Sequence, residues 1–343
     1  MRTVNVAILG ATGVVGQELA QLLAERQFPL GNLKLLASPR SAGKKITVSG
    51  QEYVIEAVSA ESFQDIDIAF FSAGGDVSKQ WAPIAVAAGA VVIDNTSAFR
   101  MDPAVPLVVP EVNKEAALTH RGIIANPNCS TIIMVVALKP IYDAVGIRRI
   151  IVSTYQAVSG AGYQAMEELD AQVSAYTAQE EQTATLLPVA SCEKHYPILF
   201  NAIPQIDIFD EGDYTKEEWK MINETQKIFG DTTLRITATT VRLPIMRSHC
   251  ESINVETKHK MTADHCRQLL TEASGIEVVD DVQSQEYPMP IYTSGQDPVW
   301  VGRIREDRSI DCGLNLWVVG DQIRKGAALN AIQIAEYLVP NLR

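Results

Sequence analysis

The sequence lacks several features that mark whole classes of protein. It contains no run of about 18 apolar residues, so we expect no membrane-spanning helix. No basic segment followed by a long apolar stretch stands at the N-terminus, so we expect no signal peptide. Positive charge is scarce, because 29 Lys and Arg stand against 41 Asp and Glu, a net charge of −12. This balance argues against a nucleic-acid partner.

Cysteines are few and scattered. The five stand at positions 129, 192, 250, 266 and 312, an odd number without a CxxC pair. This pattern predicts a reducing compartment, the cytoplasm, and neither structural zinc nor another metal site. The sequence assigns no role to Cys192, Cys250, Cys266 or Cys312.

The chain is long enough for two domains. It has 343 residues, of which 47% are hydrophobic and 20% charged, as in an ordinary globular protein. A single core stops growing below this length. Strands alternate with helices in the first half, which favours a parallel α/β sheet. The second half has longer, more alternating strands, which favour a mixed sheet with one face wet or covered by an interface.

A glycine-rich turn follows the first expected strand. Residues 4–9 form a near-continuous apolar strand, and GATGVVG at residues 10–16 comes next, before an apolar-striped helix. Backbone N–H groups at such a helix start can cradle a pyrophosphate, so the pattern predicts a dinucleotide-binding loop. The alternative is a strand–helix turn that binds no ligand.

The end of the second strand indicates the type of dinucleotide. An NAD enzyme usually places Asp or Glu there, to bind the ribose hydroxyls. After the strand at 33–37 this chain offers Arg40, Ser41 and nearby lysines instead. These residues suit a 2′-phosphate and predict NADP, the alternative being a solvated basic loop.

Polar loops follow two further strands. We expect these strands at 67–72 and 91–94, and NTSAFR at 95–100 follows the second. Ligands bind at the C-terminal ends of strands in such sheets, so Arg100 is a candidate anion-binding residue. The alternative is a surface arginine. Two more strands, the first at 107–109, complete this half.

A cysteine stands at the next strand–helix junction. In IIANPNCST, Pro127 ends the strand, Asn128 is a good helix N-cap, and a helix is expected over 130–143. Cys129 then lies in the first helical turn, where the pKa of a thiol can fall from ~8.5 to roughly 3.5–7.5. The position suits a nucleophile, and the alternative is a small buried apolar residue.

The second half places a histidine in a polar connection. A strand at 149–155 runs into QAVSGAG, and His249 follows Arg242 by seven residues in RLPIMRSH. An unperturbed histidine pKa of about 6.5 suits proton transfer, and the alternative is a structural histidine. The other elements we expect are helices near 163–176, 214–229 and 262–273, strands at 236–242 and 251–258, loops over 177–212, and a final helix to about Leu338.

Taken together, these motifs resemble the aspartate-β-semialdehyde dehydrogenase family, a relative of glyceraldehyde-3-phosphate dehydrogenase in fold and chemistry. The resemblance covers essentially the whole chain. NPNCST, YQAVSGAG and RLPIMRSH are specific when found together in that order. The motifs that carry it are GATGVVG (10–16), NTSAFR (95–100), NPNCST (126–131), YQAVSGAG (155–162), EEWK (217–220), RLPIMRSH (242–249) and GDQIRKGAALNAIQIAE (320–336).

The resemblance implies a two-domain α/β fold like that of glyceraldehyde-3-phosphate dehydrogenase. Residues 1–128 and 324–343 would form a Rossmann-like NADP-binding domain, to which the final helix returns. Residues 129–323 would form an α+β catalytic and dimerisation domain with a mixed sheet, and the protein would be a homodimer. The implied reaction is NADPH-dependent conversion of L-aspartyl-4-phosphate to L-aspartate 4-semialdehyde and phosphate, in lysine, diaminopimelate, methionine and threonine biosynthesis.

The resemblance also implies roles for individual residues. Cys129 would form a thioacyl intermediate, His249 would be the acid/base residue, and Gln156 would orient the substrate. The substrate's phosphate would be bound by Arg100 and Lys220, and its carboxylate and ammonium by Arg242 and Glu217. The residues expected at NADP are Gly10, Thr12, Gly13, Val14, Val15, Arg40, Ser41, Ser159, Gly160 and Gln322.

Two other functions remain open at this point. N-acetyl-γ-glutamyl-phosphate reductase runs parallel chemistry on a longer, acylated substrate, and would not need an acidic residue such as Glu217 for a free ammonium. A regulator that binds NADP without catalysis would give no phosphate-dependent reduction of NADP.

Overall fold

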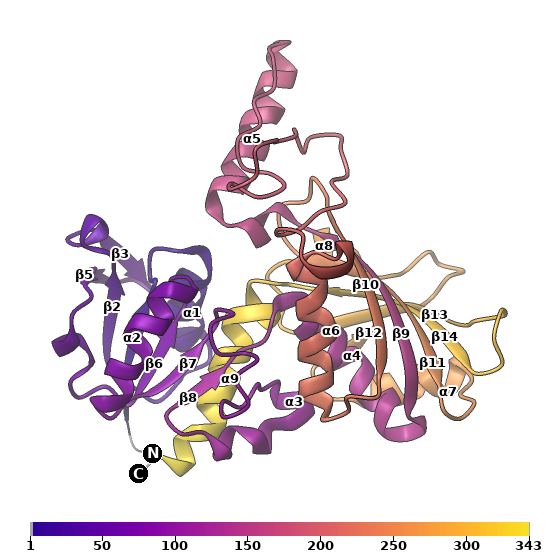
Figure 1. The fold of residues 1–343 in the computed structure, drawn as a ribbon, viewed down its shortest axis with the longest axis horizontal. Helices are drawn as coiled ribbons and strands as arrows, with labels where there is room; N and C mark the ends of the chain where they lie inside the picture. The colour runs from indigo at the N-terminus through magenta and orange to yellow at the C-terminus, as the bar shows by residue number, and fades with distance from the viewer. Residues whose placement is uncertain (1–2, 343) are drawn as a thin grey trace. The chain divides into compact units, whose positions relative to one another are not determined.

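The computed structural model describes residues 3–342, which divide into two compact units (Figure 1). The first unit comprises the chain up to residue 128, residues 227–229, and the chain from residue 326. The second comprises residues 129–226 and 230–325. One boundary therefore falls directly before Cys129.

The first unit is built on a six-stranded parallel sheet in the order β5-β2-β1-β6-β7-β8. Its strands are β1 (Val4–Leu9), β2 (Leu30–Ala37), β5 (Glu56–Ala57), β6 (Ile68–Phe71), β7 (Val91–Asp94) and β8 (Ile123–Ala125). Its helices are α1 (Val14–Glu25), α2 (Gly75–Ala87), the short α3 (Pro110–Asn113) and α9 (Leu329–Leu338). A hairpin of β3 (Lys45–Val48) and β4 (Gln51–Val54) stands apart from the sheet.

Both faces of this sheet are buried, which is why its strands are apolar throughout. Val6 and Ile8 belong to a core shared with α1 and α9, while Ala7 and Leu9 belong to a second core shared with α2. The final helix, yellow in Figure 1, thus lies with strands from the other end of the chain. The prediction of a parallel, Rossmann-like sheet is confirmed.

The expected strand at 107–109 is wrong. The structure has a single bridge there, between Leu107 and Ala125. Pro106 and Pro110 flank this segment, and Pro110 begins α3. Because proline lacks the backbone N–H that a ladder needs, three residues between two prolines cannot extend the sheet.

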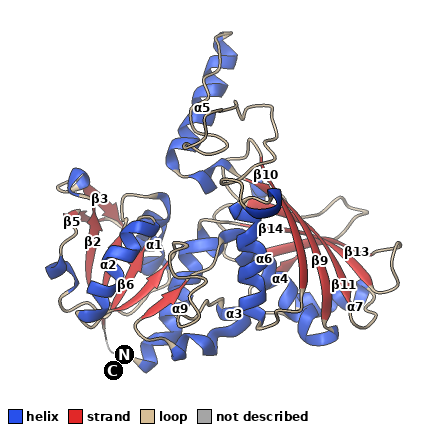
Figure 2. Cartoon of the chain, viewed as in Figure 1, coloured by secondary structure: helices blue, strands red, loops and turns tan. Residues whose placement is uncertain are grey.

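The second unit is built on a mixed sheet in the order β10-β9-β11-β14-β13-β12 (Figure 2). Its strands are β9 (Ile147–Gln156), β10 (Arg235–Arg242), β11 (His249–Thr257), β12 (Ile276–Val278), β13 (Val299–Glu306) and β14 (Gly313–Gly320). Its helices are α4 (Cys129–Val145), α5 (Tyr163–Ala178), α6 (Lys216–Phe229), α7 (Ala263–Thr271) and the short α8 (Pro290–Thr293). The prediction of a mixed sheet is confirmed.

Alternation along these strands gives the sheet an inner and an outer face. In β9, Val152, Thr154 and Gln156 are buried, whereas Ser153 and Tyr155 are only half-buried. The outer face carries Tyr155 and Trp317, whose rings lie 5.5 Å apart.

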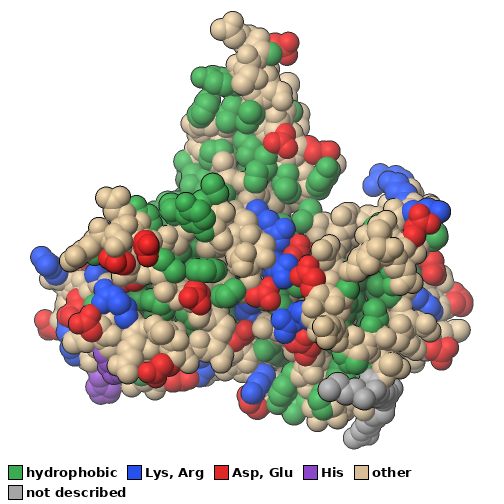
Figure 3. All heavy atoms as spheres, turned by 180° about the vertical axis from the view of Figure 1, so that it is seen from behind, with side chains coloured by type: hydrophobic (Ala, Val, Ile, Leu, Met, Phe, Trp, Pro, Cys, Tyr) green, Lys and Arg blue, Asp and Glu red, His purple; other side chains and the backbone are tan. Residues whose placement is uncertain are grey.

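Hydrophobic side chains also gather along the segment that contains α5, at the top of Figure 3. Exposed examples are Tyr163, Val173, Tyr176 and Phe200.

Two kinds of feature are absent from residues 3–342. Within this range, no group of three or more His, Cys, Asp or Glu side chains is placed to hold a metal ion. The helices of this part of the chain include none that is both long and apolar enough to cross a membrane.

Candidate active site

The glycine-rich loop of the first unit borders a cavity of about 560 Å³. Gly10 has a φ of +96°, and a Cβ there would lie 2.5 Å from the carbonyl oxygen of Ser72. A Cβ on Gly16 would lie 2.2 Å from the carbonyl oxygen of Gly10. Helix α1 begins after Gly13 without a side-chain cap. The loop therefore exposes main chain without side chains, and the uncapped N–H groups of α1, to the cavity. A pyrophosphate could bind to such N–H groups.

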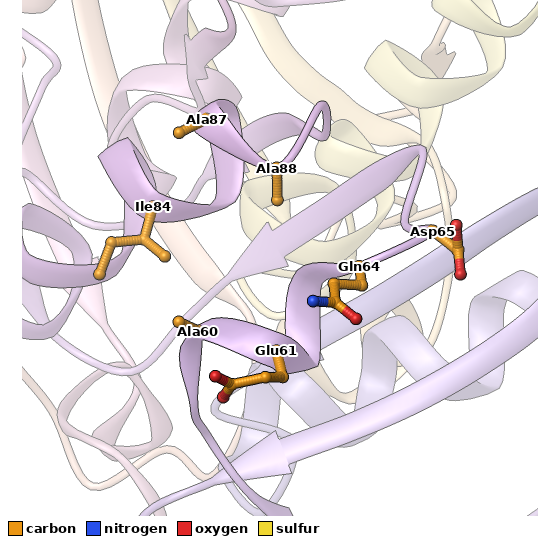
Figure 4. Close-up of a pocket in the computed structure, with 7 residues that line it drawn as sticks. All are labelled: Ala60, Glu61, Gln64, Asp65, Ile84, Ala87 and Ala88. Carbon is orange, nitrogen blue, oxygen red and sulfur yellow. The ribbon is translucent and has the colours of Figure 1, made fainter.

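The other expected cofactor residues of this unit lie on or beside the cavity. Thr12 and Gly13 line it, and Val14 and Val15 open α1. Arg40 and Ser41 belong to a 3₁₀ turn that follows the cavity-lining residues 38–39, and Arg40 is exposed. A second hollow, between residues 60–65 and α2, has no Lys or Arg in its lining (Figure 4). It offers no comparable site for a phosphate.

Arg100 is buried in the first unit rather than displayed on its surface. Its exposed fraction is 7%. Its Nε donates to the carbonyl oxygen of Asn126 at 2.9 Å, and its Nη2 to that of Asn95 at 2.7 Å. Two main-chain carbonyls at the ends of neighbouring strands thus fix the direction of the guanidinium.

Cys129 is the first residue of α4 and is half-buried. The helix begins one residue earlier than we expected and continues to Val145, with Asn128 directly before it. Charge on the Cys129 sulfur raises the pKa of the Arg242 guanidinium, so the two groups are electrostatic neighbours. A helix start and a nearby guanidinium both favour the thiolate over the thiol.

Arg242 ends β10 and is almost completely buried. Its Nη1 donates to the carbonyl oxygen of Ala157 at 2.6 Å, while its Nε has no hydrogen-bond partner among the described residues. Burial lowers the pKa of Arg242, and Glu217 and Cys129 oppose that shift. A buried donor without an acceptor is costly, unless a ligand supplies the acceptor.

His249 begins β11 instead of lying in the connection before it, and it is fully buried. Burial, and then the charge of Arg242, lower its pKa to about 3, against an opposing effect of Glu217. The expectation of an ordinary histidine pKa is therefore wrong, because sequence alone does not show desolvation. The N–H of Ala157 donates to Nδ1 at 3.1 Å, and Nε2 has no partner among residues 3–342. The neutral ring consequently carries its hydrogen on Nε2.

A chain of polar contacts links Gln156 to α6. The Nε2 of Gln156 donates to Glu217 at 3.3 Å, and Lys220 donates to the other Glu217 oxygen at 3.1 Å. Lys220 also donates to Asp207 at 2.8 Å. No pattern in the sequence pointed to Asp207, which lies in the aperiodic segment that we expected to be loops. Lys220 therefore lies between two carboxylates, which weakens its attraction for a phosphate.

Gly160 lies against the side chains of both Arg242 and His249. A Cβ on Gly160 would stand 2.8 Å from Arg242 Nη1 and 3.1 Å from His249 Nε2. Ser159 and Gln322 join this group, because the Gln322 amide donates to the Ser159 hydroxyl, and Gln322 Oε1 accepts from the backbone N–H of Ser248 at 2.7 Å. All the expected site residues of the second unit are thus brought together.

Comparison with known proteins shows the family to which the chain belongs. Models described as "Semialdehyde dehydrogenase, NAD binding domain" and "Semialdehyde dehydrogenase, dimerisation domain" match residues 5–120 and 138–325. An aspartate-semialdehyde dehydrogenase from Aquifex aeolicus is 55% identical over 338 residues, which cover 98% of each chain.

Solved structures extend the comparison. A crystal structure titled aspartate semialdehyde dehydrogenase II complexed with ASA, from Vibrio cholerae, is 48% identical, with a TM-score of 0.95 and full coverage of both chains. An aspartate semialdehyde dehydrogenase structure with NADP, from Candida albicans, is 28% identical, with a TM-score of 0.77 and full coverage of both. The chain belongs to the aspartate-semialdehyde dehydrogenase family of oxidoreductases, as its motifs predicted.

Proposed function

We propose that the chain converts L-aspartyl-4-phosphate to L-aspartate 4-semialdehyde and phosphate with NADPH, through a thioacyl intermediate on Cys129. One cluster in the second unit carries this proposal. It combines a half-buried thiol at a helix start, a buried guanidinium with an unpartnered Nε, and an uncharged imidazole. These are a nucleophile, an anchor for a carboxylate, and a hydrogen-bond donor, as an acyl transfer to sulfur requires.

The aspartyl end of the substrate is assigned to Arg242 and Glu217. An α-carboxylate would give Arg242 Nε the acceptor that it lacks, and a guanidinium can grip a carboxylate with two parallel hydrogen bonds. The buried Glu217 carboxylate would accept from the substrate ammonium. Phosphate recognition is assigned to Arg100 and Lys220. Since Lys220 already donates to Glu217 and Asp207, we expect Arg100 to contribute more than Lys220 to phosphate binding.

The acyl transfer uses Cys129 and Gln156. The thiolate attacks the acyl carbon, and phosphate departs with the electron pair of the broken C–O bond, which leaves a thioester on sulfur. Backbone N–H groups at the start of α4 stabilise the oxyanion that forms on the way. The Gln156 amide, whose Nε2 points to Glu217, orients the acyl group. NADPH, when bound, supplies a hydride to the acyl carbon.

His249 acts in this proposal through Nε2–H. Because the N–H of Ala157 occupies Nδ1, the neutral ring offers its remaining hydrogen to the acyl oxygen as negative charge develops there. The tetrahedral adduct then collapses, which expels the Cys129 thiolate and forms the aldehyde. The proton of the net reaction ends on the released phosphate, so His249 needs no positive charge.

The cofactor proposal is NADP, with Arg40 and Ser41 at its 2′-phosphate. The cavity beside the glycine loop fits part of a dinucleotide, and the Candida albicans relative was crystallised with NADP. Ser159, Gly160 and Gln322 are assigned to the nicotinamide end, because they lie beside His249.

We also propose a homodimer that works in the cytoplasm. The matched dimerisation-domain model covers the mixed sheet, whose outer face is only half-buried, and α5 carries exposed aromatic residues. Five free cysteines fit a reducing compartment. The aldehyde product feeds lysine, methionine and threonine synthesis in this proposal.

The test is NADP reduction with aspartate semialdehyde, with and without phosphate, on the wild type and on Cys129→Ala. The variant should lose turnover and keep NADP binding, since Cys129 lies outside the glycine loop. Mass spectrometry of the wild type during turnover should show an acyl adduct on Cys129. Cys312→Ala, which removes another half-buried thiol, is the control and should stay active.

Four results would contradict the proposal. An adduct on another cysteine would reassign the nucleophile. Phosphate-independent turnover, or NADP binding with no turnover at all in the wild type, would reject the reaction itself. Turnover of N-acetyl-γ-glutamyl phosphate in preference to aspartyl phosphate would reject the substrate.

A further inference from the structure

The Gln156 side chain accepts a hydrogen bond from the hydroxyl of Thr154, which has no role in the proposed reaction. Thr154 and Gln156 stand two residues apart in β9, so both side chains point to the inner face of the sheet. Both are buried, with exposed fractions of 0% and 1%. The Thr154 hydroxyl donates to Oε1 of Gln156 at 2.9 Å.

This contact decides which end of the amide faces the site. The oxygen of a side-chain amide accepts hydrogen bonds, and its nitrogen donates them. With Oε1 taken by Thr154, Nε2 is left to face Glu217 at 3.3 Å. A flipped amide would set Oε1 against the Glu217 carboxylate, two acceptors with no hydrogen between them.

Thr154 and Glu217 both hydrogen-bond Gln156, and the bond to Thr154 is the one that we expect substrate binding to leave unchanged. Glu217 also accepts from Lys220 and, under the proposed function, would bind the substrate ammonium. Its hold on Gln156 therefore changes as substrate enters and leaves. The hydroxyl of Thr154 is fully buried and meets no substrate group in that scheme.

A buried carboxyl group stands opposite Thr154 in the neighbouring strand. Glu251 is the register partner of Thr154 in β11 and is fully buried, with both carboxyl oxygens lacking a hydrogen-bond partner among the described residues. Cross-strand partners lie with their Cβ atoms about 4.5–5.5 Å apart. Burial raises the pKa of Glu251 well above its ordinary value. The Glu251 oxygens do not compete for the hydrogen of the Thr154 hydroxyl, which Gln156 accepts.

We propose that Thr154 is a positioning residue, which fixes the amide of Gln156 so that Nε2 faces the acyl group. The inference rests on the proposed function, in which Gln156 orients that group. Loss of one buried hydrogen bond between neutral groups should lower kcat about threefold to tenfold. The KM for NADP should not change, because Thr154 lies far along the chain from the glycine loop and its hydroxyl contacts Gln156.

The experiment compares Thr154→Val with Thr240→Val. Thr240 is the register partner of Thr154 in β10, is equally buried, and has a hydroxyl that lies 3.4 Å from the Thr215 hydroxyl. Both substitutions replace a buried hydroxyl with a methyl group in neighbouring strands. Only Thr154→Val should lower kcat, and melting temperatures show whether the two variants are equally stable. Thr154→Ser and Thr154→Ala form a second pair, in which only the serine variant should keep the wild-type kcat.

Repeating Thr154→Val in a Gln156→Ala variant distinguishes a wrong role for Thr154 from a wrong role for Gln156. If Thr154 acts through Gln156, Thr154→Val should cost nothing further in that background. An impaired Gln156→Ala enzyme beside a normal Thr154→Val enzyme overturns the role of Thr154 alone. A normal Gln156→Ala enzyme overturns the role of Gln156 in the proposed function. Equal losses from Thr154→Val in both backgrounds overturn the inference, because the effect is then structural.

Discussion

Replacing His249 with Gln should make folding less sensitive to acid. In the folded protein, burial and then Arg242 lower the pKa of His249 from 6.5 to about 3, with Glu217 opposing. Between these two values the unfolded chain binds a proton that the folded chain does not. The contribution of His249 to stability is therefore fully present above the unfolded pKa and is lost as the pH falls toward the folded pKa.

The size of this effect follows from the two pKa values. They differ by 6.5 − 3, or about 3.5 units, and each unit corresponds to about 1.4 kcal/mol. The whole loss is therefore about 5 kcal/mol, comparable with the total stability of many domains. Between about pH 6.5 and pH 4.5 the wild type should lose about 2.3 kcal/mol that a neutral replacement keeps.

Urea unfolding at several pH values measures this difference directly. Wild type and His249→Gln should be compared at one protein concentration, because an oligomer's stability depends on concentration. The gap between their free energies of unfolding should be constant above about pH 6.5 and should shift in favour of the variant below it. His249→Asn must behave in the same way, since neither replacement titrates. Parallel curves down to about pH 4.5 would show that the folded protein already accommodates a charged imidazole, and would refute the reasoning.

Two further predictions concern the cofactor and the anion-binding residues. Arg40→Ala should weaken NADP binding about tenfold or more while changing NAD little, since it removes a charge-assisted contact to the 2′-phosphate; equal losses in titrations of both cofactors would make Arg40 a surface residue only. In the phosphate-consuming direction, Arg100→Leu should raise the KM for phosphate more than that for the semialdehyde, and Arg242→Leu should do the reverse. Arg242→Lys should also be damaging, because lysine keeps the charge and loses the planar fork. Loss of phosphate affinity in the Arg242 variants would mean that the two ends of the substrate are exchanged.

Local patterns predicted those parts of the fold that local physics determines. The apolar strands β1 and β6 and the turn at Gly10 could be recognised because burial on both faces, and a close backbone approach, each leave a mark in neighbouring residues. The start of α4 at Cys129 was predicted to within one residue for the same reason.

Properties of the site that depend on residues far apart in the sequence could not be predicted from local patterns. The low pKa of His249 comes from burial and from Arg242 on another strand, and a sequence window shows neither. Asp207 meets Lys220 from an aperiodic segment. Thr154 could have been suspected, because strand periodicity places it on the face of Gln156, but a threonine in a strand is too common to single out.

One peptide segment has a consequence for how this enzyme tolerates change. The carbonyl oxygen of Ala157 accepts from Arg242, and its N–H donates to His249, so a single residue holds both groups through its main chain. Proline alone would remove the N–H, and no residue type removes the carbonyl oxygen, because the main chain is common to all of them. A scan that truncates side chains one at a time would therefore score this position as silent. The orientation of Arg242 and His249 therefore depends on main-chain atoms, which point mutations rarely remove.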